Sequence, residues 1–156
     1  MPGRTRASNF STTWRDPVLH VLLSALSVEQ RHAIMEVLVA VAAADGEVVA
    51  EEAACLEALM GAAMIHPEAR AVLRSQLAEP PLWSASLAQV GVEHGRLMLY
   101  LSAYVAAVDG AYDEEEVSLL REICNAMEAD LAVLESAFEW VEQGLEWAAA
   151  IDGEAE

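Results

Sequence analysis

Apolar residues recur along most of this chain at intervals of three and four positions, which places them on one face of an α-helix. Clear examples are Ile34, Leu38, Val41 and Ala42, then Met98, Leu101, Val105 and Ala106. No segment alternates apolar and polar residues as a half-buried strand does. We therefore predict an all-α protein with at least six helices.

Residues that favour helix ends predict where these helices begin and stop. Asp16 with Pro17 predicts the start of a short first helix, and Ser27 with Gln30 forms the capping-box pattern for the next. That helix should stop at Asp45-Gly46, because glycine adopts the left-handed conformation that closes many helices. Further helices are expected to begin near Val49, at His66-Pro67, after Gly95, at Asp113 and near Ala129.

One short sequence pattern occurs twice. Asp-Gly at 45–46 is followed by Glu-Glu at 51–52, and Asp-Gly at 109–110 is followed by Glu-Glu at 115–116. When residues 33–63 are aligned with 97–127, nine positions are identical. Each copy joins two predicted helices by a short connection, which favours a helix hairpin. We predict a compact helical bundle built from two pseudo-symmetric helix-hairpin repeats.

The composition limits the function classes. The net charge is −18, and all eight basic residues are arginines. Such a field repels nucleic acid and anionic membrane surfaces, and it attracts cations or basic partners. The two cysteines, Cys55 and Cys124, form no C-x-x-C pair, so we expect buried free thiols rather than a zinc site.

Length and hydropathy indicate one folded domain. Residues 1–15 are polar and Arg-bearing and predict a flexible N-terminal tail, 16–150 a single helical domain, and 151–156 an acidic C-terminal tail. The N-terminal stretch has no apolar run of signal-peptide length, and no apolar run reaches the ~18 residues of a membrane span. We expect a cytoplasmic protein that does not insert into a membrane.

The repeated acids suggest a cation site. A hairpin brings the Asp and Glu of one copy to the same end, and a pseudo-two-fold axis would bring both copies together there. The four predicted ligands are Asp45, Glu52, Asp109 and Glu116. Converging carboxylates repel one another unless a hard cation such as Ca²⁺, Mg²⁺ or Mn²⁺ binds or a proton is retained.

Helix capping is the alternative interpretation of the same acids. Glu52 and Glu116 fall at the third position of their helices, where a Glu can bond back to the backbone N–H of the cap residue. An EF-hand is excluded, because the twelfth loop position must be Glu, whereas it is Leu56 counted from Asp45 and Leu120 counted from Asp109.

Two copies of A-x-D-G-x(5)-E in an all-α chain resemble the TerB-like family associated with tellurite resistance, over roughly residues 28–145. The resemblance implies a helical bundle with an acidic surface that binds divalent cations. It implies a non-enzymatic component of bacterial stress-response or membrane-associated complexes, and Asp45, Glu52, Asp109 and Glu116 as ligands. This chain departs from the pattern at Val49, where a polar cap is expected, and at Ala111, which is the counterpart of Glu47.

Other chemistry is sparse. The four histidines show no ligand spacing, and no phosphate loop or nucleophile motif occurs, so no enzyme is expected. Glu135, Glu139, Glu142 and Glu146 follow one side of the last helix and predict either a solvated face or a docking face for a partner. Two function classes stay open: a TerB-like cation-binding module, or an acidic protein–protein interaction domain without metal whose motif acids only cap helices.

Overall fold

The computed structural model describes residues 15–108 and 112–152. Within these ranges it contains eight α-helices and one 3₁₀ helix, and no strand. The elements are α2 (Arg15–Ser24), α3 (Val28–Ala42), α4 (Ala50–Ala62), α5 (Pro67–Ser75), α6 (Trp83–Val90), η2 (Val92–His94), α7 (Gly95–Ala107), α8 (Glu114–Ala126) and α9 (Leu131–Asp152). The all-α prediction is confirmed for the described chain.

Most predicted helix ends are observed within a few residues. α3 follows Ser27, whose Oγ accepts from the Gln30 N–H while the Gln30 side chain accepts from the Ser27 N–H, each at 3.1 Å. Gly46 has φ +84°, the left-handed conformation that the sequence predicts, although α3 ends earlier at Ala42. Asp113 caps α8 by accepting from the Glu115 N–H at 2.9 Å.

The capping box at Ser27 gives a direct stability prediction. Replacing Ser27 by alanine is expected to lower the free energy of unfolding by about 1 kcal/mol, because it leaves the Gln30 N–H without its acceptor. Urea denaturation measures the change. Ser118→Ala, an exposed serine within α8, is the matched control and is expected to be neutral or slightly stabilising. Equal losses in both variants would contradict the capping role.

One helix was not predicted. α6 spans only eight residues between Pro80-Pro81 and Gly91, which is too short to show a helical repeat of apolar positions. Its Leu87 and Val90 are buried, and its main contact is with α3. Packing against α3 therefore stabilises a segment whose own sequence gives little helical signal.

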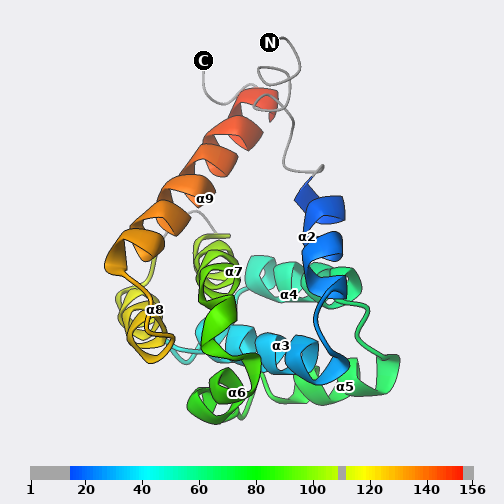
Figure 1. The fold of residues 1–156 in the computed structure, drawn as a ribbon. Helices are drawn as coiled ribbons and strands as arrows, with labels where there is room; N and C mark the ends of the chain where they lie inside the picture. Colours follow the sequence, from blue (N-terminus) through cyan, green and yellow to red (C-terminus); the bar gives the residue numbers. More distant parts are fainter. Residues whose placement is uncertain (1–14, 109–111, 153–156) are drawn as a thin grey trace.

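α3 and α7 form the centre of the bundle (Figure 1). Every residue of α3 from Ala33 to Ala42 except Glu36 is buried, and α3 contacts α4, α6 and α7. α7 contacts α8 and α9 in addition to α3, while α2 packs on α4. α3 also contacts α8, and α4 contacts α7, so the two helix pairs that carry the repeated motif lie against each other. This arrangement positions the repeated acids.

Candidate functional site

Glu52 of α4 and Glu116 of α8 meet inside the bundle. Each is the third residue of its helix, and their exposed fractions are 4% and 3%. The two carboxyl groups lie within hydrogen-bonding reach of each other. Carboxyl groups are rarely buried to this extent unless they are paired. Two residues that are far apart in the sequence thus form one buried acid pair.

Both glutamates also bond to the backbone at the start of their own helices. The Val49 N–H donates to Glu52 Oε1 at 3.1 Å, and the Asp113 N–H donates to the Glu116 side chain. These are the bonds that the capping interpretation predicts. Capping therefore explains why each glutamate points back along its helix, but it does not explain why the two carboxyls contact each other.

The acid pair retains a proton. Burial, then the hydrogen bond and the negative charge of Glu52, raise the pKa of Glu116 to about 9. The charge of Asp45 also raises the pKa of Glu116, whereas the hydrogen bond from the Asp113 N–H lowers it. At neutral pH the Glu116 carboxyl is therefore protonated and donates to Glu52. Glu116 Oε2 is buried and accepts no hydrogen bond from the described residues.

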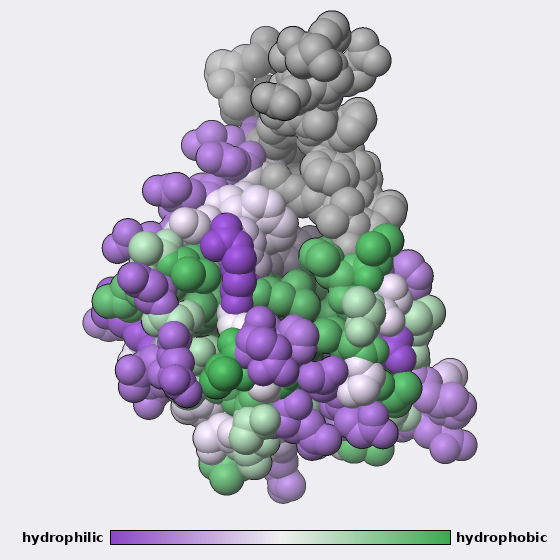
Figure 2. All heavy atoms as spheres, viewed as in Figure 1, coloured by the Kyte–Doolittle hydropathy of each residue, from purple (hydrophilic) through white to green (hydrophobic). Residues whose placement is uncertain are grey.

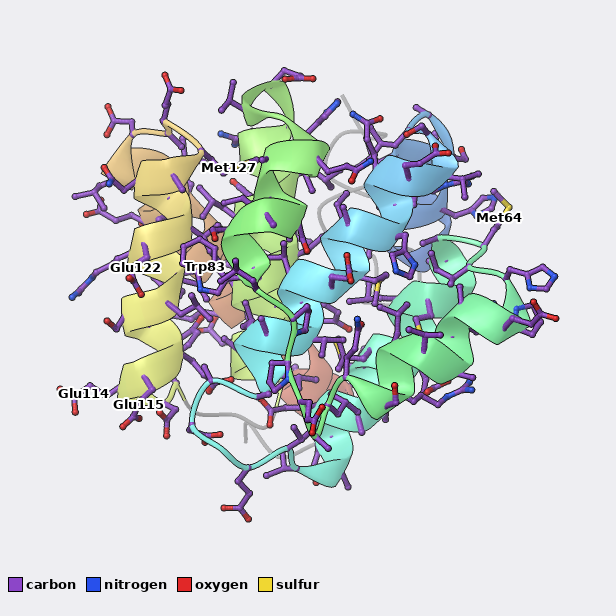
Figure 3. The ribbon with its side chains drawn as sticks, turned by 90° about the horizontal axis from the view of Figure 1, so that it is seen from below. Met64, Trp83, Glu114, Glu115, Glu122 and Met127 are labelled. Carbon is purple, nitrogen blue, oxygen red and sulfur yellow. The ribbon has the colours of Figure 1, made fainter. Side chains whose placement is uncertain are left out.

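Asp45 and Asp113 extend the acid pair toward the surface. Asp45 Oδ1 accepts from the Glu47 N–H at 2.9 Å, and its carboxyl lies within hydrogen-bonding reach of the Asp113 carboxyl. Interactions with Glu115, and to a smaller extent with Asp45, lower the pKa of Asp113. The same contact between Asp113 and Glu115 raises the pKa of Glu115. Glu115 points outward from the start of α8 (Figure 3). From the sequence, Asp113 was predicted only as a helix cap, because it stands before α8 as Val49 stands before α4.

Three of the four predicted ligands therefore come close together, namely Asp45, Glu52 and Glu116. Asp109, with Gly110, lies outside the described residues. Within residues 15–108 and 112–152, no group of three or more His, Cys, Asp or Glu side chains is arranged to hold a metal ion. The structure thus brings acids of both motif copies together, and the four-ligand metal site stays a prediction.

Cys55 and Cys124 are buried thiols that form no disulfide within the described residues, as predicted. Glu36 accepts from Gln76 Nε2 at 3.1 Å and from Ser86 Oγ at 3.2 Å, which links α3, α6 and the segment after α5. None of the described helices combines the length and the apolar character that a membrane crossing requires.

Comparison with known proteins gives one family match. Residues 16–75 match the model of the family described as tellurite resistance protein TerB. The match contains the first copy of the repeated motif, with Asp45 and Glu52, and ends before the second. Searches of curated proteins and of solved structures gave no match. Over residues 16–75 the chain therefore carries a TerB-family domain.

Proposed function

We propose that this chain is a non-enzymatic TerB-type module that binds a divalent cation (Ca²⁺, Mg²⁺ or Mn²⁺) through Asp45, Glu52, Asp109 and Glu116. The observation that carries the proposal is the buried contact between the Glu52 and Glu116 carboxyl groups, one from each copy of the motif. Two buried carboxyl groups repel each other unless a proton or a cation lies between them, and carboxylate oxygens are the preferred ligands of hard cations. The carboxylate chemistry of these residues is what supports the proposal.

The proposal includes a pseudo-two-fold relation between the two hairpins. α3 packs on α7, α3 contacts α8, and α4 contacts α7, so each hairpin makes the corresponding contacts with the other. Leu56 and Leu120, which are identical in the alignment of the two copies, are 1% and 0% exposed. A two-fold relation would place Asp109 near Glu52, because the charge of Asp45 acts on Glu116.

We propose a role in stress response rather than catalysis, because the acids that cluster here are carboxylates without a nucleophile or a basic residue among them. The family description, tellurite resistance protein, supports the stress-response assignment. The charge of −18 supports a protein partner over nucleic acid. We place this partner in a membrane-associated complex in the cytoplasm, as the resemblance to the TerB-like family implies.

The second candidate is an acidic interaction domain that binds no metal. The backbone bonds from Val49 to Glu52 and from Asp113 to Glu116 favour it, because they give both glutamates a structural role. In that case Glu116 stays protonated in the folded protein, and this proton removes the repulsion between the two carboxyl groups without a metal.

Thermal unfolding with added metal separates the two candidates. At about a hundred times its dissociation constant, a cation that binds only the folded state adds about 2.7 kcal/mol. We expect a higher melting temperature in Ca²⁺, Mg²⁺ or Mn²⁺ than in a chelator, and we expect Glu116→Gln and Asp109→Asn to lose that metal-dependent gain. Glu68→Gln with Glu79→Gln, two exposed acids outside the acid pair, is the control and should keep it. A melting temperature that no metal changes would leave the interaction domain as the function.

A further inference from the structure

The last helix presents an amphipathic face that is separate from the acid pair. Leu131, Phe138 and Leu145 follow one another at seven-residue intervals and so lie on the same side of α9. We call these three residues the apolar row. Leu131 and Leu145 are 59% and 37% exposed, and the Phe138 ring is half-buried with its centroid 4.8 Å from that of Tyr112. The apolar row therefore lies at the border of the core.

A line of exposed acids runs beside the apolar row. It consists of Glu135, Glu139, Glu142 and Glu146, which we call the glutamate row. At 100° per residue these acids lie next to the apolar row and away from the buried residues Leu134, Ala137 and Val141. Residues 127–152 contain seven acidic residues and no basic residue. Figure 2 shows the hydrophilic surface, interrupted by hydrophobic residues, along the left edge where α8 and α9 lie.

α7 packs against one side of α9 and is shorter than α9, so the side that carries the two rows stays exposed. α7, the main packing partner of α9, has 13 residues against 22 in α9, so at 1.5 Å per residue it is about 13 Å shorter. α7 covers the side of α9 that carries Leu134, Ala137 and Val141. An apolar row with a seven-residue period beside a row of charges is the pattern of a helix that packs along a second helix.

We propose that this face of α9 binds a basic amphipathic helix of a protein partner. The apolar residues of that helix, at intervals of three and four, pack on the apolar row, and its Lys or Arg residues pair with the glutamate row. This inference is independent of cation binding at Glu52 and Glu116, because no residue of the two rows belongs to the acid pair.

Charge selects this occupant over others. A second copy of the chain also carries a net charge of −18 and the same glutamate row, so two copies repel each other. An anionic membrane surface is repelled for the same reason. A basic helix is attracted over a distance of about one Debye length, ~10 Å at 0.1 M salt, and its binding should weaken as salt is added.

A designed peptide tests the proposal on the full chain. The probe has three heptads, with Leu at the a and d positions and Arg at e and g, and its own arginines disfavour self-association. We expect it to bind and to gain helical ellipticity, whereas a scrambled peptide of the same composition should bind at least about tenfold more weakly. Glu139→Gln with Glu146→Gln, and separately Leu131→Ser with Leu145→Ser, should each weaken binding about tenfold.

The controls distinguish the named surface from general charge attraction. Glu68→Gln with Glu79→Gln changes the net charge equally and should bind the peptide as the parent does. The proposal would be overturned if the scrambled peptide bound as tightly as the probe. It would equally be overturned if Glu68→Gln with Glu79→Gln weakened binding as much as Glu139→Gln with Glu146→Gln. It would also be overturned if Phe10→Ser with Trp14→Ser strengthened peptide binding, since the chain's own N-terminal segment would then be the occupant. Self-association of the parent that Leu131→Ser with Leu145→Ser abolishes would assign the face to a second copy.

Discussion

Replacing Glu116 by glutamine is expected to stabilise the fold at pH 9 and to change it little at pH 5. In the folded protein the pKa of Glu116 is raised to about 9, against an ordinary value of 4.5. Between these values the folded state holds a proton that the unfolded state has released, so the contribution of Glu116 to stability is complete below pH 4.5 and is lost as the pH rises to 9. The limiting slope for one proton is about 1.4 kcal/mol per pH unit.

Glutamine has nearly the same shape as a protonated glutamate and can make the same hydrogen bonds, but it does not ionise as the pH rises. Its Oε1 can accept from the Asp113 N–H, and its Nε2 can donate to Glu52. The difference in free energy of unfolding between variant and parent should therefore grow from pH 5 to pH 9. Urea denaturation at several pH values, with a chelator present to exclude metal effects, measures this difference.

The control for this experiment is Glu79→Gln, an exposed acid outside the acid pair, which should give the same difference from the parent at every pH. Because the other acids of the chain titrate in both proteins, only the difference between variant and parent is informative. A Glu116→Gln variant whose stability parallels that of the parent from pH 5 to 9 would show that Glu116 is ionised in the folded state.

Truncating either of the two repeated leucines, Leu56 or Leu120, is expected to cost about 2–5 kcal/mol in free energy of unfolding. Both side chains are almost completely buried, at 1% and 0% exposed, so alanine removes buried methyl groups and leaves a cavity. Chemical denaturation measures the loss. Leu82→Ala is the matched control, because Leu82 is 72% exposed and its truncation should change stability by less than about 0.5 kcal/mol.

Comparable losses for Leu56→Ala and Leu120→Ala would support the proposed equivalence of the two hairpins. A loss confined to one of them would mean that the two copies share a motif but not a packing environment. A small effect of both, similar to that of Leu82→Ala, would contradict the burial that the structure assigns to these residues.

The sequence by itself determined the features that depend on neighbouring residues. The helical class followed from apolar spacing, and the caps at Ser27 and Asp113 followed from side chains within three residues of the backbone groups they bind. Burial of Cys55 and Cys124 followed from the apolar behaviour of free cysteine. The repeat of the Asp-Gly and Glu pattern singled out Asp45, Glu52, Asp109 and Glu116 as one group, of which the structure describes all but Asp109.

Only the tertiary structure decided how those acids behave. A third-position glutamate bonds to its own helix whether its other side faces water or another carboxyl, so neither helix encodes the contact between Glu52 and Glu116. The retained proton is a consequence of burial and of this long-range pairing. The exposure of Leu131 and Leu145 was decided in the same way, because the apolar period of α9 does not reveal that α7 covers only one side of it. Periodicity is a local property, whereas burial depends on which element lies opposite.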